Sequence, residues 1–325
     1  MSTLNERAST AATAATATTA ANAPAHAGSP TAPTAPAGPS TPAGGAPGPR
    51  SWSWWSPLRL ALLWLATAAF VYPLVWLVSA ALKPKSQVFD NRLIPADVQW
   101  HNFVEVWRAG PVLQWLLNSV MVGLMAAITV TLSSALVAFG FAYFRFRGRG
   151  LLFALVLSTM MLPGAVTMIP VYLIWNHLGM VDTQVPLWAQ NLFGSAFYIF
   201  LLRQFFLGIP RELFEAARVD GCSYFGMFRR IALPLARPAL IIVFVFELQA
   251  SWSDLMKPLI YLQTESYFTM PRGLKLIVDS FALSGEYHWE IAMAATLLAT
   301  LPMIIVFAFA QRHILDGIAT SAKQG

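Results

Sequence analysis

Charge is scarce in this sequence. Only 11% of its 325 residues are Asp, Glu, Lys or Arg, whereas 57% are hydrophobic. Soluble domains carry about a quarter charged residues, so the composition indicates a chain embedded in lipid rather than a water-soluble domain. The 12 tryptophans agree with this, because indole rings concentrate at membrane–water interfaces.

Cysteine and clustered histidine are also missing. Cys222 is the single cysteine, which excludes a disulfide within the chain. A structural zinc site needs several Cys or His ligands, and the five histidines are scattered, so we expect no metal. His288 and Glu290 could form a metal-binding pair, but two ligands alone are poor support for a site.

Motifs for nucleotide and nucleic-acid binding are absent as well. The sequence has no G-x-x-x-x-G-K-[ST] phosphate loop, so the chain cannot bind ATP through that motif, and we expect no cofactor. No basic surface interleaved with aromatic residues accompanies the net charge of +6, so nucleic-acid binding is not indicated. No nucleophile or metal cluster suggests an enzyme.

The N-terminal segment, residues 1–50, has low complexity. It consists mainly of Ala, Pro, Thr, Ser and Gly, with eight prolines between Pro24 and Pro49. Such a segment has almost no apolar surface to bury, so we expect a disordered tail. It lacks the apolar core of a signal peptide. A membrane domain is expected to occupy residues 58–325.

Long apolar runs dominate the rest of the sequence. A helix needs about 20 apolar residues to cross the hydrocarbon core of a bilayer, and six windows with little charge supply them. The predicted spans are 60–82, 113–143, 151–174, 183–202, 238–262 and 291–311. The sequence therefore predicts an all-α membrane protein with six transmembrane helices. Prolines inside these spans predict kinks, namely at Pro73, Pro163, Pro170 and Pro302.

The distribution of basic residues predicts the orientation. If the N-terminus is cytoplasmic, two thirds of the 21 Lys and Arg residues fall on the cytoplasmic side. The short loop Arg145–Arg149 alone has three arginines and no acidic residue. The positive-inside rule therefore predicts a multi-pass cell-membrane protein with both termini in the cytoplasm.

The loop between the fourth and fifth predicted spans, residues 208–234, contains the strongest local signals. Pro210 suits the start of a helix, and Arg211–Val219 favours helix. Asp220 and Gly221 then predict a turn in which the glycine takes a positive φ. The first helix of the loop should therefore end at the turn.

A second short helix should follow the turn. Ser223 can cap a helix over residues 224–231, which Pro234 would end before the fifth span. Together the two segments predict a pair of short helices at the inner face of the membrane, joined at a glycine.

The first helix of this pair has the character of a docking element. Leu213, Phe214 and Ala217 are predicted to share one face. Ala216 and Ala217 leave room for a partner surface to approach closely, and Glu215 offers a carboxylate to a basic partner. The other interpretation is a helix that lies on lipid headgroups, but its acidic residues disfavour contact with an anionic leaflet.

The spacing within this loop resembles the EAA motif of ABC importer permeases, which reads E-A-A, three residues, G, nine residues, I-x-L-P. This sequence matches the motif at each position. The resemblance implies an ABC importer permease (MetI-like) bundle in which the loop holds a coupling helix that fits a cleft on an ATPase. The residues that carry it are Glu215, Ala216, Ala217, Asp220, Gly221, Ile231, Leu233 and Pro234.

The C-terminal segment extends the resemblance. Residues 311–325 are similar to the tail of the maltose-permease G-type subunits, which belong to the carbohydrate-uptake subgroup. Residues Trp252–Asp254 read Trp-Ser-Asp, whereas that subgroup usually shows Trp-Asn-Asp or Trp-Asn-Glu. The resemblance implies import of a sugar or oligosaccharide, and the departure leaves the sugar open.

The same resemblance implies partners. In such systems a second permease completes the pathway, an ATPase dimer supplies energy, and an extracytoplasmic solute-binding protein delivers the substrate. ATP hydrolysis is therefore expected on a separate subunit, and this chain is expected not to be an enzyme.

A polar stripe is predicted within the fifth span. Glu247, Ser251 and Asp254 fall at i, i+4 and i+7, on one helix face, and Lys257 can pair with Asp254. One interpretation is a pathway wall that hydrogen-bonds sugar hydroxyls, with Trp252 as a stacking surface. The other is a structural polar contact with the partner permease or a buried, protonated Glu247, since intramembrane carboxylates avoid lipid.

Two other classes of transporter remain open at this point. One is an ABC permease for another small solute, which the ligand of the cognate binding protein would distinguish. The other is an ion-coupled carrier that uses Glu247. Such carriers often contain internal repeats with paired broken helices, and no matching second half is evident in the sequence.

Overall fold

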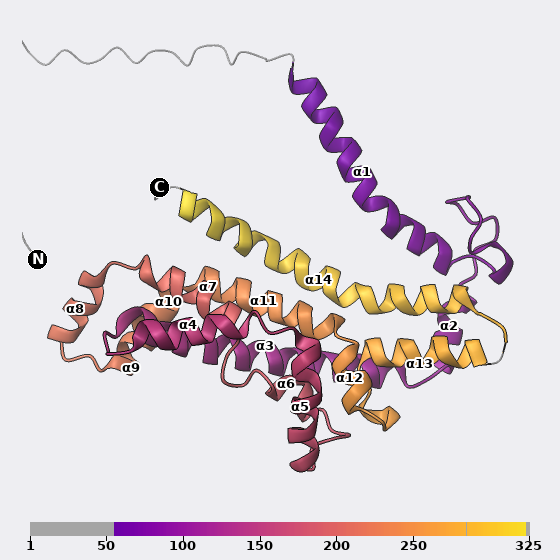
Figure 1. Ribbon diagram of the computed structural model, residues 1–325. Coiled ribbons are helices and arrows are strands. Elements are labelled where there is room, and N and C mark those ends of the chain that lie inside the picture. The colour runs from indigo at the N-terminus through magenta and orange to yellow at the C-terminus, as the bar shows by residue number, and fades with distance from the viewer. Residues whose placement is uncertain (1–54, 284, 323–325) are drawn as a thin grey trace, which may run out of the picture. The chain divides into compact units, whose positions relative to one another are not determined.

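A computed structural model describes residues 55–283 and 285–322, with side chains described between residues 57 and 311. The predicted disordered tail, residues 1–50, lies outside this part of the chain. Every regular element within it is helical (Figure 1), in agreement with the predicted all-α class. The elements are α1 (Trp55–Ala81), η1 (Lys85–Gln87), α2 (His101–Arg108), α3 (Val112–Tyr143), α4 (Arg149–Thr159), α5 (Gly164–His177), α6 (Val185–Ala189), α7 (Ala196–Leu207), α8 (Arg211–Val219), α9 (Tyr224–Met227), η2 (Phe228–Ala232), α10 (Leu233–Leu235), α11 (Arg237–Ser253), α12 (Met256–Tyr261), η3 (Glu265–Tyr267), α13 (Met270–Leu283) and α14 (Trp289–Ala322).

Helix α3 is the centre of the bundle. It packs most extensively against α11 and α7, and α11 also packs against α14 (Figure 1). Small side chains allow this close approach. A Cβ atom on Gly123, for example, would lie 3.0 Å from Cδ1 of Leu248 on α11. The buried face of α3 is rich in such residues, including Ala126, Ala127, Ser134, Ala135 and Ala138.

Three of the predicted spans are continuous helices. Residues Pro57–Ala81, Val112–Tyr143 and Trp289–Gln311 are each long and apolar enough to cross a membrane. These correspond to the first, second and sixth predicted spans, which are therefore confirmed as long apolar helices.

The third predicted span is broken. Helices α4 and α5 are bent by 97° relative to each other, and Pro163 lies at the break with an extended backbone (φ −60°, ψ 133°). Proline cannot donate the helical hydrogen bond at this position and disfavours a helical conformation for the residue before it. The predicted kink at Pro163 is thus a complete interruption.

The fourth predicted span, residues 183–202, is wrong as a single helix. Gly194 has a φ of 103° between α6 and α7, and the backbone N–H of Ser195 donates to Oγ of Ser134 at 3.1 Å. This irregular segment is anchored on α3, so the helical part shifts to α7, which is too short to count as a span.

The fifth predicted span, residues 238–262, is interrupted too. Helix α11 ends at Ser253, Asp254 is extended, and α12 begins at Met256. At its other end, α11 is bent by 80° from the segment Tyr224–Leu235. The described residues thus contain three helices of spanning length, or five spans if each bent pair counts as one, and the predicted six are not confirmed.

Helix α13 was not predicted, because Arg272, Lys275 and Asp279 interrupt its apolar residues in the sequence. It buries Met270, Gly273 and Ile277. Trp115 of α3 is fully buried beside it. A Cβ atom on Gly273 would lie 2.1 Å from the Trp115 ring, so only glycine allows this helix to pack so closely.

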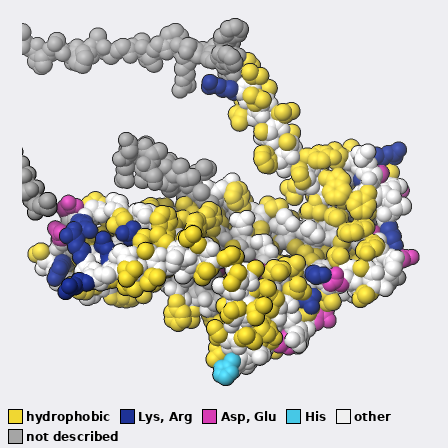
Figure 2. Space-filling view, viewed as in Figure 1, with side chains coloured by type: hydrophobic (Ala, Val, Ile, Leu, Met, Phe, Trp, Pro, Cys, Tyr) yellow, Lys and Arg dark blue, Asp and Glu magenta, His cyan; other side chains and the backbone are white. Residues whose placement is uncertain are grey.

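The surface agrees with a lipid-embedded body. Large apolar side chains remain exposed along α1 and α14, among them Phe70, Trp64 and Phe309. Figure 2 shows Lys and Arg side chains gathered at the end of the molecule where α8 and α9 lie. We call this end the α8 end.

Candidate functional site

Helix α8 forms where the sequence predicts it, from Arg211 to Val219, with Pro210 as the preceding cap residue. The helix is amphipathic. Phe214 is buried, and Ala217 packs against the same hydrophobic cluster. Leu213, predicted to share this face, lies at its edge, where its side chain is 46% exposed. Residues one position apart are separated by about 100° around a helix, so Leu213 is only partly covered when Phe214 points inward.

A Schellman motif ends α8 and explains the glycine. The backbone N–H of Cys222 donates to the carbonyl of Ala217 at 2.9 Å, and that of Gly221 donates to Arg218 at 3.1 Å. This pairing requires a left-handed residue at the first position after the cap, and Gly221 has a φ of 76°. The motif usually includes an apolar contact between the residues that Ala217 and Cys222 represent, and both pack on one cluster. The three residues between Ala217 and Gly221 are therefore the last two residues of α8 and its cap residue, Asp220.

The second helix of the loop begins as predicted but continues further. Oγ of Ser223 accepts a hydrogen bond from the N–H of Gly226 at 3.1 Å, which confirms the predicted cap. The prediction that Pro234 ends this helix is wrong. Pro234 lies inside α10, and the bend follows at Ala236.

A π-helix accommodates that proline. The segment Phe228–Ala232 has π-helical geometry, and Leu233 N–H donates to the carbonyl of Phe228. Pro234 lacks an N–H and its ring crowds the carbonyl four residues earlier. The wider turn just before it displaces that carbonyl, so the chain stays helical through Pro234.

An aromatic cluster lies beneath the two helices. The Phe214 ring centroid is 5.9 Å from that of Phe139 and 5.3 Å from that of Tyr143, both on α3. Phe228 lies 5.4 Å from Phe139, and Phe206 of α7 lies 6.0 Å from the same ring. Four elements thus meet at Phe139, and α8 cannot shift without disturbing α3 and α7.

A charged recess of about 320 Å³ lies between α8, the C-terminal end of α3 and α9. Arg145, Arg211 and Arg218 line it together with Glu215 and Tyr224. The guanidinium carbon of Arg218 lies 5.9 Å from the Tyr224 ring centroid. The recess therefore combines donors for an acidic group with one carboxylate for a basic one.

The residues of the predicted docking motif divide by exposure. The part available to a partner comprises Glu215, Ala216, Asp220, Gly221 and Pro234, which are exposed. The part that packs inward comprises Ala217, Ile231 and Leu233, which contact the cluster around Phe139.

The predicted polar stripe does not stay together. Glu247 is buried within α11, and the Tyr198 hydroxyl of α7 is within hydrogen-bonding reach of its carboxylate. Ser251 is half-buried on the same helix. Asp254 lies beyond the end of α11, so it leaves the face that Glu247 and Ser251 share.

Asp254 and Lys257 form the pair that the sequence predicts. Nζ of Lys257 lies 3.3 Å from Oδ2 of Asp254, and Oδ1 accepts the backbone N–H of Lys257 at 3.2 Å. Trp252 is turned away from them. Its indole is buried, and Nε1 donates to the carbonyl of Ala299 on α14 at 3.1 Å, which is the packing of a structural residue and not of a stacking surface.

Comparison with known proteins supplies the family. Residues 119–319 match the family described as binding-protein-dependent transport system inner membrane component. The chain belongs to this family.

Relatives of this permease are named for several solutes. This chain is 29% identical over 278 residues to the arabinooligosaccharides transport system permease protein AraQ of Bacillus subtilis, covering 83% of this chain and 97% of that one. It is 33% identical over 270 residues to the sn-glycerol-3-phosphate transport system permease protein UgpE of Pectobacterium atrosepticum, covering 81% and 95%. A chain of a bacterial ABC transporter involved in import of the acidic polysaccharide alginate has the same fold, with a TM-score of 0.70 over 79% of this chain and 95% of that one at 23% identity.

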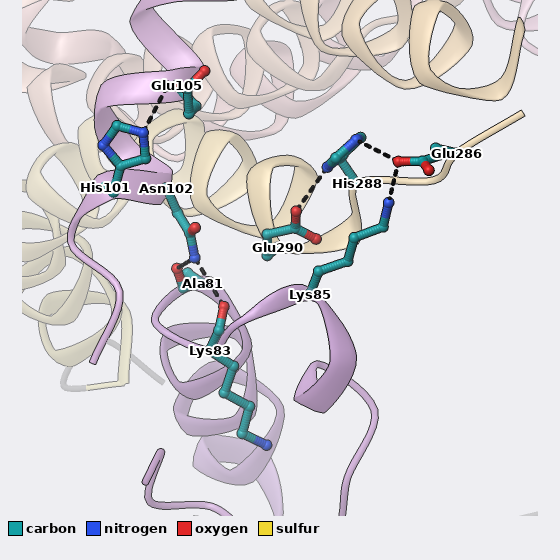
Figure 3. A network of polar contacts seen from close by, with 9 residues as sticks. All are labelled: Ala81, Lys83, Lys85, His101, Asn102, Glu105, Glu286, His288 and Glu290. Atoms are coloured by element: carbon teal, nitrogen blue, oxygen red, sulfur yellow. Dashed lines mark hydrogen bonds and ion pairs between the residues drawn. The ribbon is translucent and has the colours of Figure 1, made fainter. Parts of the chain in front are cut away.

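A polar network that the sequence did not predict joins the segment after α1 to the segment before α14 (Figure 3). Nδ1 of His288 lies 2.9 Å from Glu290, and Nε2 lies 3.6 Å from Glu286, which Lys85 also contacts at 2.8 Å. The hydrogen bond from Lys85 lowers the pKa of Glu286. His288 and Glu290 are thus within hydrogen-bonding distance of each other, and no group of three or more metal-ligating side chains occurs in the described residues.

Asp182 is a further residue whose role the sequence concealed. Its Oδ1 accepts the backbone N–H groups of Gln263 and Thr264, each at 2.8 Å, and its Oδ2 accepts the Thr264 hydroxyl. These bonds, the Thr264 hydroxyl first, lower the pKa of Asp182. Its φ of 61° is unusual for a residue other than glycine. The sequence around Asp182 and Thr183 resembles any exposed loop, so no local signal predicts this role.

Proposed function

We propose that this permease is one transmembrane subunit of an ATP-driven, binding-protein-dependent importer, and that α8 docks on a separate ATPase subunit. One observation carries the proposal. Among the described residues, the outer face of α8 is exposed, whereas Phe214 on its inner face packs on the aromatic cluster around Phe139. Force applied to that outer face would reach α3 through Phe214, and α7 through the contact between Phe139 and Phe206.

The chemistry of the exposed face suits a protein partner. Ala216 leaves space for close approach, and Leu213 and Val219 are 46% and 88% exposed. Glu215 and the neighbouring arginines supply charges of both signs. Such a surface, apolar at its centre and charged at its rim, is typical of protein interfaces.

The proposed cycle follows from this seating. Closure of the ATPase dimer on binding ATP would move α8, and the bundle would change between inward- and outward-facing states as a rigid-body rearrangement. A second permease would complete the pathway, and an extracytoplasmic solute-binding protein would deliver the solute. Both termini are proposed to be cytoplasmic, since the basic α8 end then obeys the positive-inside rule.

The proposed substrate is a sugar or oligosaccharide. This rests on the relative AraQ, named for arabinooligosaccharides, and on the resemblance of the C-terminal segment to carbohydrate permeases. Purifying the complex and identifying the solute held by the co-encoded binding protein tests it. Capture of a solute that is not a carbohydrate would refute the sugar assignment while leaving the docking proposal intact.

A matched pair of variants tests the docking role. Ala216→Arg places a bulky charge on the exposed face of α8, so we expect co-purification of the ATPase and solute uptake to fall at least tenfold at normal membrane levels of the chain. Ala96→Arg, also at an exposed alanine but far along the chain from α8, is the control and should retain both. Equal ATPase recovery with the two variants would exclude α8 as the docking element.

A further inference from the structure

A cavity of about 440 Å³ lies between two interrupted helices. Thr167 and Met168 of α5 line one side, and Asp254, Lys257 and Tyr261 line the other, with Gln190 between α6 and α7. The volume lies in the range of about 300–1,000 Å³ that small-molecule sites occupy. This cavity is separate from Glu247, the carboxylate that the sequence singled out, which does not line it.

The breaks in the helices give the cavity its position. Helix α5 starts directly after the 97° bend at Pro163, and α12 starts after the extended Asp254. Non-helical backbone at membrane depth is tolerated where it is buried in protein or lines a water-filled cavity. Interruption on both sides of one cavity fits either situation, and the partly exposed, charged Asp254–Lys257 pair on its wall favours the water-filled one.

The charges in the cavity compensate each other. Lys257 and Asp254 pair at 3.3 Å, and their side chains stay 36% and 22% exposed. An ammonium group has three donors and a carboxylate has about four acceptor sites, so the pair retains unused donors and acceptors without a net charge. The amide of Gln190 interacts with the Tyr261 hydroxyl and offers another mixed donor and acceptor.

A neutral wall with both donors and acceptors matches hydroxyl groups, because each hydroxyl donates and accepts. It matches an anion poorly, since the one ammonium group is already paired. The remaining lining is apolar, from Met168, Val171, Met256 and Ile260, and such side chains suit the C–H faces of a sugar ring.

We propose that this cavity is a solute-binding subsite of the permease for a neutral, polyhydroxylated compound, contacted by the Asp254–Lys257 pair and Gln190. The proposal rests on the proposed import function and its sugar substrate, and adds the place in the fold and the residues that contact the solute. It separates this chain from its relatives that are named for anionic solutes, sn-glycerol 3-phosphate and alginate.

Cysteine labelling in the assembled complex tests the subsite. Because Cys222 is the single cysteine, Cys222→Ala gives a background in which Thr167→Cys is the only thiol in the chain. Thr167→Cys should react with membrane-impermeant thiosulfonates, and arabinobiose or lactose should slow the reaction severalfold, whereas sn-glycerol 3-phosphate should not. Asp97→Cys, exposed between the first two predicted spans and outside the cavity, is the control whose labelling no solute should slow.

A second arm tests the charge balance without knowledge of the solute. In the Thr167→Cys protein, Lys257→Gln leaves the Asp254 carboxylate unpaired. The labelling rate with a cationic thiosulfonate should then rise about fivefold relative to that with an anionic one. This is the effect of a single short-range charge in a wet site. Asp254→Asn should produce the opposite preference. No change in either variant, or protection of Thr167→Cys by the anionic solute alone, would overturn the subsite.

Uptake separates failure of the subsite from failure of the import function. If the complex imports a sugar with ATP while labelling of Thr167→Cys ignores every neutral saccharide, the subsite is wrong and the function stands. If no ATP-dependent, binding-protein-dependent uptake occurs at all, the import function itself is wrong.

Discussion

At the scale of single residues, Gly221 has the clearest physical requirement. Its φ of 76° closes the Schellman motif that ends α8, yet a Cβ atom there would meet nothing within 4 Å. The requirement is thus conformational and not steric. An L-residue other than Asn or Asp costs about 1–2 kcal/mol in this conformation.

Substitutions at Gly221 should follow that cost. We expect Gly221→Asn to retain uptake, Gly221→Ala to reduce it severalfold, and Gly221→Pro to abolish it, because proline cannot adopt the positive φ and loses the N–H that donates to Arg218. ATP-dependent uptake, with ATPase activity stimulated by the loaded binding protein, measures the effect. Equal uptake for the Asn and Ala variants would contradict the conformational explanation.

At the scale of elements, Asp182 joins two segments that are distant in sequence. It ties the segment before α6 to the segment after α12 through three hydrogen bonds to its carboxylate. Its own N–H donates to the carbonyl of Tyr261 at 2.8 Å. This tie holds α12, and with it one wall of the cavity, against α6.

Removing this carboxylate should loosen the tie in a pH-dependent way. We expect Asp182→Ala to lower the midpoint of thermal unfolding of the detergent-purified complex by a few degrees at pH 7. The folded-state pKa of Asp182 lies below its ordinary value of 3.8, so the contribution is complete above pH 3.8 and is lost as the pH falls through the folded-state value. The difference from the unmodified protein should therefore be constant above about pH 5.

The control for this measurement is Asp97→Ala, which removes an exposed carboxylate and should leave the midpoint unchanged. A difference between Asp182→Ala and the unmodified protein that grows toward acid would show that the tie does not depend on the ionised carboxylate.

At the scale of the whole molecule, the aromatic cluster around Phe139 connects the α8 end to the bundle. Phe214, Phe228 and Phe206 reach Phe139 from α8, η2 and α7. Packed interiors transmit displacement because they have few voids. Coupling between an ATPase and the pathway should therefore depend on how well Phe214 fills its site.

Truncation of Phe214 should uncouple the transporter. Phe→Ala changes in a core cost about 3–5 kcal/mol, and Phe214 is 4% exposed. We expect Phe214→Ala to lose uptake at least tenfold while the complex retains basal ATP hydrolysis, and Phe214→Leu to retain most uptake. Phe193→Ala, at a side chain that is 86% exposed, is the control. Full stimulation of ATP hydrolysis by the binding protein in Phe214→Ala would show that force takes another route.

Local signals predicted the loop of the candidate site closely. The bounds of α8, the positive φ of Gly221 and the cap at Ser223 all depend on residues within one or two helical turns, which is the range over which propensity and capping act. The docking role of the motif residues stays a prediction. The polar stripe was less accurate, because its helical spacing assumed that α11 continues past Ser253.

The sequence by itself determined that this chain is helical and lipid-embedded and that a glycine-linked helix pair interrupts its apolar runs, because hydrophobicity and turn chemistry are local properties. Only the tertiary structure decided where the helices break, which residues share a cavity and which anchor distant segments. The chain leaves the helix at Gly194, where φ is 103°, and Ser134 accepts the backbone N–H of Ser195. Gln190, Asp254 and Lys257 meet because two interrupted helices converge. Such contacts join residues far apart in the chain, and no local pattern specifies them.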